Sequence, residues 1–401
     1  MLFHVGITGI QHITFSTKGG AGGVACELNR GISLTGVKTE VISVTDGAIP
    51  DLKLKMPILV ITALFDFFIV RSRRSHQLFT LFRRFIRLKP SVIRRNKVGI
   101  IHLHWTPGVI SMKQIAKHLQ YGKQMVWTLH DMWAFTGGCH FSDTCLEFSK
   151  SCSHCPQVKP IFHTFVQKSL NQKVELFRNT KSLKIVAPSH WLKSQALLSE
   201  ALSGRDIAVI PNPIDCNVFK PTFNSQTRES NFVIGCSAAN LLETRKGISL
   251  LVKWTENYVS HFPDRKLTIL AIGSGQLKSE IVDIRLTGFI SDKKYLNDLY
   301  NEMDIFVSLA TSENLPLNVA EAVASGLPVI CSDSGGIPEL IHHGESGFVA
   351  SSENEFHSYL SAFVSNPELI TKMGASARSK ALSEFDTTVV VNRYLDLYSS
   401  I

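Results

Sequence analysis

The chain contains 401 residues, of which 44% are hydrophobic and 19% are charged. This length is too great for one comfortable hydrophobic core and predicts about two domains, while the composition excludes disordered, fibrous and collagen-like proteins. The formal net charge of +9 makes the chain basic, and the excess cations are concentrated in one region rather than spread evenly.

The first segment, MLFHVGITGI, lacks the basic region and long apolar stretch of a secretory signal peptide. We expect it to form a first buried strand over residues 2–10. A glycine-rich turn then opens into a helix, and it contains Gly19, Gly20, Gly22 and Gly23. Glycines at the start of a helix let the backbone approach a diphosphate closely.

A basic segment follows the apolar run MPILVITALFDFFIV, which contains Asp66 and is shorter than the roughly 20 residues of a membrane span. Ten Lys or Arg then fall within residues 71–97, interleaved with apolar residues at a spacing that fits a basic amphipathic helix broken at Pro90. Such a helix predicts contact with an anionic membrane surface rather than with nucleic acid. The structural alternative is a core helix followed by a solvated basic face.

Short apolar runs alternate with helical patterns along the rest of the chain, which is typical of parallel sheets with crossover helices. In the first half we expect strands at 38–45, 98–105, 124–131 and 183–189, and a helix at 190–202. Residues 207–231 contain three prolines, and this segment is predicted to be a linker. In the second half we expect strands at 231–240, 266–275, 283–290, 303–310 and 327–336, with helices between them that include 295–303 and 318–326.

The fold class predicted from this order is α/β, with two doubly wound, Rossmann-like domains. We assign residues 1–205, together with a closing helix at 386–401, to the first domain and residues 206–385 to the second. In such folds ligands bind outside the carboxyl ends of the strands.

The stretch SENLPLNVAEAVASG places Glu313 in the loop after a predicted strand and Glu321 one turn into the following helix. The backbone N–H groups of Asn314 and Leu315 fall near the start of this helix, which suits phosphate oxygens. A carboxylate accepts hydrogen bonds from two sugar hydroxyls at once. The alternative for Glu321 is a helix glutamate favoured by the helix dipole.

The two glutamates belong to a longer ordered series, which continues through ASGLPVICSDSGGIPELIHHGESGFVA and is preceded by LTGFISDKKYLNDLYNEMDIFVSLA and IPNPID. This series resembles the retaining glycosyltransferases of family 4 (glycosyltransferase group 1), in particular the bacterial surface-polysaccharide type. The resemblance is strong over residues 185–385. It implies the GT-B fold, in which two Rossmann-like domains face each other across a cleft and a C-terminal helix returns to the first domain.

The resemblance also implies roles for individual residues of the second domain. Glu313 would lie against the transferred sugar, and Glu321 would hold the ribose hydroxyls of the nucleotide. Lys246, in ETRKGISLL, matches the family lysine that pairs with the donor diphosphate, where a cation would stabilise the leaving group. This chain has Leu241 where the family often has Arg, and we consider Arg245 its substitute.

In the first domain, the resemblance assigns Gly19 and Gly20 to a loop that contacts the donor diphosphate. It also implies a catalytic-site role for His130, in VWTLHDMWAFTGGCHF, as a residue that contacts the donor sugar or the reacting centre. The alternative for His130 is a structural histidine. Retaining transfer in this family lacks an agreed protein nucleophile, so the departing phosphate is a candidate to receive the acceptor proton.

Four of the eight cysteines lie in the short segment CHFSDTCLEFSKSCSHCP, and they are Cys139, Cys145, Cys152 and Cys155. Without a secretion signal, reduced thiols in the cytosol are expected. Four thiolates are a ligand set for a tetrahedral structural zinc, and free thiols or disulfides are the alternatives. No Asp-x-Asp follows a predicted strand, so we expect no catalytic metal ion and no cofactor for catalysis.

The function implied by the resemblance is that of a retaining, hexosyl-type glycosyltransferase, with a nucleotide-diphosphate sugar as donor. The expected acceptor is a growing, lipid-linked oligosaccharide of a surface polysaccharide such as an exopolysaccharide, O-antigen or capsule. We expect a cytoplasmic protein that is peripheral on the inner face of the membrane. The alternatives are a nucleotide-sugar epimerase on the same fold and a catalytically inactive, basic GT-B scaffold. The sequence does not distinguish GDP from UDP donors.

Overall fold

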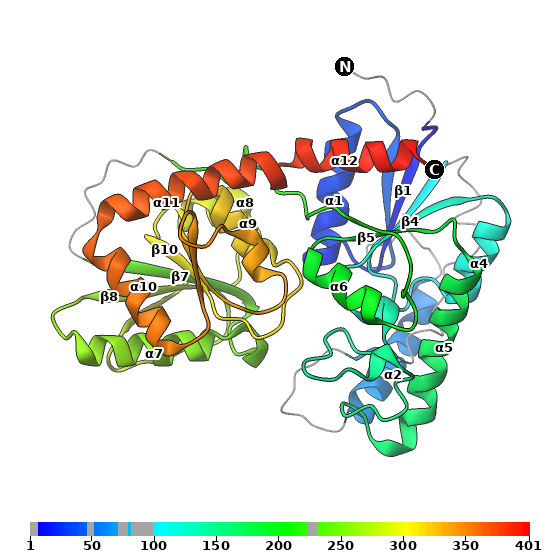
Figure 1. Cartoon of the computed structure of the whole chain (residues 1–401), viewed down its shortest axis with the longest axis horizontal. Helices are drawn as coiled ribbons and strands as arrows, with labels where there is room; N and C mark the ends of the chain where they lie inside the picture. Colours follow the sequence, from blue (N-terminus) through cyan, green and yellow to red (C-terminus); the bar gives the residue numbers. More distant parts are fainter. Residues whose placement is uncertain (1–6, 46–51, 71–78, 82–98, 223–230) are drawn as a thin grey trace. The chain divides into compact units, whose positions relative to one another are not determined.

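The computed structural model describes residues 7–45, 52–70, 79–81, 99–222 and 231–401, with the backbone alone for 52–59. The basic segment at 71–97 therefore lies outside the described residues, apart from 79–81. Internal contacts divide the chain into two units (Figure 1). The first unit comprises Met1–Pro213 and Val390–Ile401, and the second comprises Ile214–Val389.

The first unit is built on a sheet of six strands in the order β2-β1-β3-β4-β5-β6, all of them parallel. These strands are β1 Ile10–Thr14, β2 Thr39–Ser43, β3 Ile100–Leu103, β4 Gln124–Thr128, β5 Lys184–Ala187 and β6 Ile207–Val209. All five residues of β1 and all four of β3 are buried. Burial on both faces is typical of a parallel sheet that is covered by crossover helices.

The helices of the first unit begin at recognisable sequence signals. At the start of α4, the Ser111 side chain accepts a hydrogen bond from the backbone N–H of Gln114, and the Gln114 side chain accepts one from the backbone N–H of Ser111, which completes a capping box. At the start of α6, the Ser189 side chain accepts a single cap bond from the backbone N–H of Leu192. The helices are α1 Gly20–Ser33, α2 Leu52–Ile69, α4 Met112–Gln120, α5 His163–Asn179 and α6 His190–Leu198.

The last helix, α12 (Thr387–Ser399), packs on the first unit although the second unit precedes it in the chain (Figure 1, red). Two buried tyrosines attach it through hydrogen bonds to the sheet. Tyr394 Oη bonds Thr128 Oγ1 at 2.8 Å, and Tyr398 Oη bonds His102 Nδ1 at 2.6 Å. The helical spacing of apolar residues at the end of the sequence predicted this helix correctly.

The second unit repeats the architecture with a six-stranded parallel sheet in the order β12-β11-β10-β7-β8-β9. Its strands are β7 Phe232–Asn240, β8 Leu267–Ser274, β9 Asp283–Leu286, β10 Ile305–Ser308, β11 Val329–Ser332 and β12 Gly347–Ala350. Its helices are α7 Ile248–His261, α8 Lys293–Tyr300, α9 Leu317–Ala324, α10 Glu353–Ser365 and α11 Pro367–Lys380. Apolar clusters fill both faces of this sheet.

Two elements differ from the sequence-based expectations for physical reasons. Of the first strand expected at 2–10, residues 2–6 lie outside the described residues and 7–9 are not in a strand, and the first described strand is Ile10–Thr14. Its polar residues Gln11 and His12 are fully buried, so the strand lacks an apolar signature. The division between the units falls after Pro213 rather than at residue 205, because β6 pairs with β5 and so belongs to the first sheet.

The docking of α12 yields a stability prediction. Replacing Tyr398 with Phe leaves His102 Nδ1 buried without its hydroxyl partner, so Tyr398→Phe should lower the free energy of unfolding by about 1–3 kcal/mol. Tyr394→Phe is the matched control, because Thr128 keeps its hydrogen bond from His102 and the loss should be smaller. Urea denaturation followed by tryptophan fluorescence measures both variants. Equal losses would contradict this account of how the helix docks.

Candidate active site

Glu313 lies in the loop that follows strand β10 in the second unit. Although acidic, it is only 9% exposed. Its Oε1 oxygen contacts Arg245 Nη1 at 2.7 Å and also pairs with Lys246 Nζ. Both cations come from the short 3₁₀ turn Thr244–Lys246 after β7. A buried carboxylate is tolerated when cations and hydrogen bonds compensate its lost hydration, so the pairing accounts for the burial of Glu313.

Backbone contacts join the loop of Glu313 to the loop of the two cations. Thr311 N donates to Arg245 O at 2.9 Å, and Arg245 Nη1 also donates to Ser312 O at 2.7 Å. Gly247 has φ +69°, and a Cβ atom there would lie 1.9 Å from Leu309 O. Only glycine fits this approach, so the backbone itself holds the two loops together.

The glycine pair of the SDSGG motif supports Glu313 from the other side. A Cβ atom on Gly335, which has φ +63°, would lie 1.8 Å from Glu313 O. The neighbouring Gly336 N donates to the same carbonyl at 3.1 Å. The backbone of Glu313 is therefore fixed by the motif that follows β11, and its side chain is fixed by the cations that follow β7.

Arg245 and Leu241 occupy very different environments. Leu241 is 1% exposed and belongs to the apolar core of the second unit. Arg245 donates from Nε and Nη2 to Glu243 Oε1 at 3.0 and 2.6 Å in addition to its contact with Glu313. Burial alone lowers the pKa of Arg245, but the charges of Glu313 and Glu243 more than reverse this and raise it. The positive charge beside Glu313 thus comes from Arg245 and Lys246.

Glu321 occupies the second turn of helix α9, whose start is preceded by the buried residues Asn314 and Leu315. Its Oε2 oxygen accepts a hydrogen bond from Tyr300 Oη at 3.1 Å. Burial raises the pKa of Glu321 to about 7, although the hydrogen bond from Tyr300 and the charge of Lys293 act in the opposite direction. Near neutral pH this side chain is therefore divided between its acid and carboxylate forms.

The glycine-rich turn and His130 line one pocket of about 300 Å³ in the first unit, together with Lys18, Trp105 and Asp131. Gly20 contributes to this pocket at the start of α1, and Gly19 precedes the helix with φ +81°. The structure thus brings together the predicted glycine loop and the predicted histidine of the first unit.

His130 follows strand β4 and is connected to a chain of histidines. Its Nε2 atom bonds His104 Nδ1 at 3.0 Å, and His104 Nε2 bonds His12 Nδ1 at 3.0 Å. Burial lowers the pKa of His130 to about 4, although Asp131 raises it. Burial likewise lowers the pKa of His12 to about 3. Neutral imidazoles can pass one hydrogen bond to the next along such a chain.

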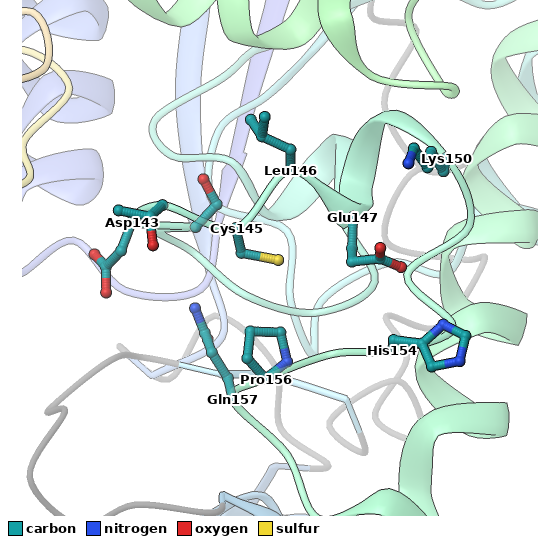
Figure 2. Close-up of a pocket in the computed structure, with 10 residues that line it drawn as sticks. Asp143, Cys145, Leu146, Glu147, Lys150, His154, Pro156 and Gln157 are labelled. Carbon is teal, nitrogen blue, oxygen red and sulfur yellow. The ribbon is translucent and has the colours of Figure 1, made fainter.

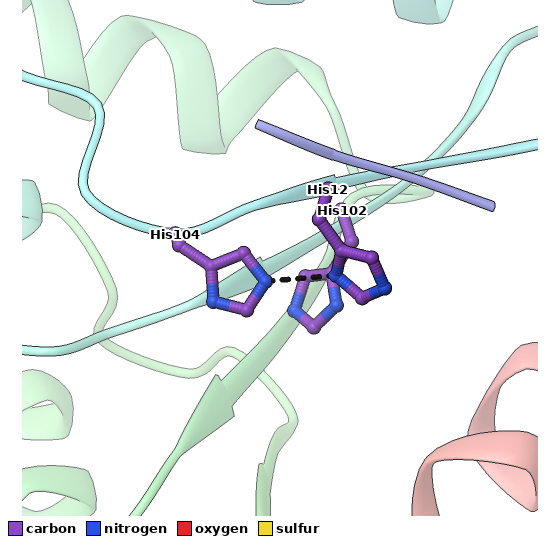
Figure 3. Close-up of side chains that lie close together, drawn as sticks. All are labelled: His12, His102 and His104. Atoms are coloured by element: carbon purple, nitrogen blue, oxygen red, sulfur yellow. Dashed lines mark hydrogen bonds between the residues drawn. The ribbon is translucent and has the colours of Figure 1, made fainter. Parts of the chain in front are cut away.

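Three of these histidine side chains also form a compact group, because the ring nitrogen atoms of His12, His102 and His104 lie within 4.8 Å of one another (Figure 3). Within the described residues it is the one group of at least three His, Cys, Asp or Glu with this spacing. His102 is already bonded to Thr128 Oγ1 at 2.8 Å and to Tyr398. We therefore interpret the group as a buried hydrogen-bond network.

Sequence reasoning missed the histidine chain and identified only His130, the end of the chain that lines the pocket. The available signal was the segment HLHW, because two residues that are two apart on a strand face the same side.

Asp131, next to His130, is occupied by structural contacts. It accepts from Trp105 Nε1 at 3.0 Å, from Trp133 N at 2.8 Å and from His140 Nδ1 at 2.6 Å.

The four clustered cysteines lie in the first unit, in the loop that follows His130. Cys139, Cys152 and Cys155 are buried, Cys145 is half-buried, and none of them forms a disulfide. Together they line one small cavity.

Comparison with known proteins identifies the family. The model of Glycosyltransferase Family 4 matches residues 18–218, which is half of the chain, and the model of Glycosyl transferases group 1 matches residues 232–366. The chain belongs to glycosyltransferase family 4. The expectation that this protein is a glycosyltransferase is thereby confirmed.

Among its curated relatives, the glycosyltransferase is 24% identical over 321 residues to the putative colanic acid biosynthesis glycosyl transferase WcaC of Escherichia coli, with 75% of each chain covered. It is 24% identical over 272 residues to an Escherichia coli UDP-Gal:alpha-D-GlcNAc-diphosphoundecaprenol alpha-1,3-galactosyltransferase, which covers 61% of this chain and 69% of the relative.

The solved structures confirm the expected GT-B type of fold. The glycosyltransferase has a TM-score of 0.66 and 16% identity to a glycosyltransferase from Rickettsia africae, with 98% of both chains covered. It has a TM-score of 0.62 and 15% identity to HepE of Anabaena in complex with UDP and glucose, covering 98% of this chain and 100% of that one. No helix among the described residues has the length and apolar character needed to span a membrane.

The raised pKa of Glu321 predicts how stability depends on pH. A carboxyl pKa of about 7 in the folded state, above the value near 4.5 expected for the unfolded chain, means that the folded state binds more protons between these values. Stability from this group should therefore fall as pH rises from about 4.5 to 7. Glu321→Gln removes that dependence. The thermal midpoint of the variant minus that of the wild type should therefore be larger at pH 8 than at pH 5.

Calorimetry at the two pH values measures these midpoints. Glu280→Gln, which removes an exposed carboxylate, is the control and should leave the difference between pH 5 and pH 8 unchanged. A shift between wild type and Glu321→Gln that is the same at both pH values would count against the assigned environment of Glu321.

Proposed function

We propose that this glycosyltransferase is a retaining enzyme that transfers a hexosyl group from a nucleotide-diphosphate sugar to a growing, lipid-linked glycan of a surface polysaccharide. The observation that carries the proposal is the pairing of the buried Glu313 carboxylate with Arg245 and Lys246 at the carboxyl end of strand β10. Ligands of open α/β sheets bind at this edge.

The two cations supply the positive charge that a diphosphate leaving group requires. Glu313 pairs with both Arg245 and Lys246, and Glu243 also pairs with Arg245. A diphosphate placed beside them would share these cations, and the negative charge that grows as the sugar departs would strengthen the interaction. Because the protein supplies this charge itself, the proposed step needs no metal ion for it.

Glu321 is the proposed ligand of the nucleotide ribose. It lies in the second turn of α9, on the same loop-and-helix segment as Glu313, and its carboxylate has the two acceptor oxygens that neighbouring hydroxyls need. The backbone N–H groups of Asn314 and Leu315 precede the helix and are proposed to lie beside the phosphates. Gly19 and Gly20 in the first unit are proposed to approach the same diphosphate.

In the proposed reaction, the bond between the anomeric carbon and the diphosphate oxygen breaks, and a bond from the acceptor hydroxyl oxygen forms on the same face of the sugar. The hydroxyl proton passes to the departing phosphate oxygen. Glu313 lies against the transferred sugar and stabilises its developing positive charge. His130 is neutral near pH 7, because burial lowers its pKa to about 4, so it would contact the sugar through a hydrogen bond rather than a charge.

The relatives support this choice of donor and acceptor. The Escherichia coli galactosyltransferase is named for a UDP-sugar donor and a diphosphoundecaprenol-linked acceptor, and the HepE structure contains UDP and glucose. WcaC is named for colanic acid biosynthesis. The curated relatives do not favour the epimerase or the inactive scaffold that the sequence left as alternatives.

The proposal predicts that Glu313→Gln lowers the rate of sugar transfer by at least about 100-fold, because the carboxylate acts on the transition state. Glu321→Gln should instead raise the KM for the donor, by roughly tenfold, with a smaller effect on kcat. Glu302→Gln, on the surface of the same unit, is the matched control and should behave as the wild type.

Transfer or hydrolysis of a panel of UDP- and GDP-sugars measures these rates and identifies the base. Proton NMR of the product gives the anomeric configuration. Normal turnover by the Glu313→Gln variant, or an inverted product, would refute the mechanism.

We also propose a peripheral location on the membrane, which helix α2 supports because large apolar side chains are exposed on it while two of its polar side chains are buried. Thr62 and Asp66 are buried, and Asp66 Oδ1 accepts a hydrogen bond from Leu81 N at 2.9 Å. The exposed face is apolar, and each of its large side chains is 51–60% exposed: Val60, Ile61, Leu64, Phe65, Phe67 and Phe68. A continuous apolar face of this kind marks an interaction surface.

The surroundings of α2 favour an anionic membrane as the partner. Lys159 N donates to Ile69 O at 3.0 Å, which places the turn of the 78% exposed Ile161 next to the end of α2. Lys159 and Lys168 are exposed on this part of the unit. The ten basic residues within 71–97 follow α2 directly in the sequence. Apolar side chains that enter the interface beside cations that meet lipid headgroups are the chemistry of peripheral membrane binding.

Binding to vesicles of phosphatidylglycerol and phosphatidylcholine tests this location. The double variant Phe67→Ser and Phe68→Ser should sediment with these vesicles several-fold less than the wild type. The matched control is Leu34→Ser with Leu198→Ser, which removes exposed apolar side chains from α1 and α6 instead. Charge reversal of Arg83, Arg84 and Arg87 should also release the protein. Unchanged sedimentation of the phenylalanine variant would rule out α2 as the contact.

A further inference from the structure

The cysteine loop, defined here as residues 136–158, has buried thiols but almost no regular structure. Its one helical element among these residues is the 3₁₀ turn Glu147–Ser149. Nevertheless Cys139, Cys152 and Cys155 are 4–7% exposed. Cys152 also has φ +52°, which is unusual for a residue other than glycine. A loop with so little secondary structure needs another source of order to hold these positions.

The four cysteines of this loop face a common centre. They line one cavity of about 10 Å³, which has room for about one water-sized sphere. Each sulfur lies close enough to the other three for a thiolate on one to raise the pKa of another. The wider pocket alongside opens toward solvent, and Figure 2 shows the Cys145 sulfur pointing into it near Glu147.

Burial raises the pKa of all four thiols, and hydrogen-bond donors around the sulfur atoms partly offset this effect. The backbone N–H of Glu147 donates to Cys145, and the backbone N–H groups of Gln157 and Val158 donate to Cys155. In both cases a donor lies two residues after the cysteine. The backbone N–H of Gly137 donates to Cys152. Such donors stabilise the charged form of a sulfur ligand and orient it toward a metal.

A buried lysine lies next to these thiols, and Asp131 is the carboxylate whose charge acts on it. Lys173 is 1% exposed, and its Nζ atom donates to Trp133 O at 2.5 Å and to Thr136 O at 2.7 Å. No carboxylate of the described residues forms an ion pair with it. Its charge acts on Cys139 and Cys152. Because a buried cation without a direct ion pair is costly, a negative group among the cysteines would stabilise it.

We propose that Cys139, Cys145, Cys152 and Cys155 bind one structural zinc ion. A zinc ion with four thiolates carries two net negative charges, which compensates the buried ammonium of Lys173. Binding releases the thiol protons to solvent. The site is structural because all four tetrahedral positions are filled by protein, which leaves none for a substrate.

Zinc binding requires the four sulfur atoms to move toward one another. Zn–S bonds of about 2.3 Å imply sulfur–sulfur distances of about 3.8 Å. In the structure no three of the four sulfur atoms all lie within 4.8 Å of one another. Cys145 is the only half-buried member, so its short segment moves most. The loop follows His130 and Asp131 directly, and His140 within it bonds Asp131, so the metal would also stabilise the pocket of His130.

Metal analysis of the full-length protein, purified under reducing conditions without chelator, tests the proposal. We expect about one zinc ion per chain, and X-ray absorption should report four sulfur neighbours at about 2.3 Å. A mercurial reagent should release the zinc as it modifies the four thiols. Cys26→Ser removes a thiol of α1 outside the loop and should keep the full zinc content.

The paired variant Cys152→Ser with Cys155→Ser should lose the zinc. Because this variant could fail to fold, the decisive measurements are those on the wild-type protein, which do not depend on activity. Wild-type protein without zinc, or with zinc that has fewer than four sulfur neighbours, would overturn the proposal. Disulfides among the four cysteines in protein isolated under reducing conditions would overturn it as well.

Discussion

A buried carboxylate between two cations is the constraint on which the second unit depends. Glu313 has lost most of its contact with water, so it requires Arg245 and Lys246, and these side chains lie on a different loop. The glycines at 247 and 335 are needed because the backbone must approach closely enough for the pairing to form. The same arrangement places two cations at the carboxyl end of the sheet, where a diphosphate could compete with Glu313 for the two cations. The interaction that holds Glu313 in place is thus also the one that a bound diphosphate would redistribute.

The first unit differs from the second because its buried polar groups lie within the sheet rather than at its edge. His12, His102 and His104 lie on adjacent strands, where each would be costly if left unpaired. His12 and His104 bond each other, and His102 bonds Thr128 and Tyr398, so that His12 Nε2 is the one ring nitrogen of these three left without a partner among the described residues. Burial keeps the rings neutral, so the network can hold His130 at one end without placing a buried positive charge in the core.

Sequence reasoning predicted the elements whose signal is local. The alternation of apolar runs and helices indicated two parallel sheets, and the helical spacing of Val390, Tyr394 and Tyr398 indicated the closing helix. It could not predict strand β1, because Gln11 and His12 look exposed until the histidines around them are known. Nor could it predict that Arg245 would contact both Glu313 and Glu243, since that depends on two loops from different strands. Sequence reasoning also could not predict that Lys173 is buried, because a lysine in a helix is usually solvated.

The return of α12 to the first unit has a consequence for how the protein forms during synthesis. His102 and Thr128 precede the second unit in the chain, but their partners Tyr398 and Tyr394 follow it. Between them the whole of Ile214–Val389 must be synthesised. The first unit therefore lacks α12 on its sheet until that helix has been made, whereas the second unit has all of its strands beforehand and can fold first.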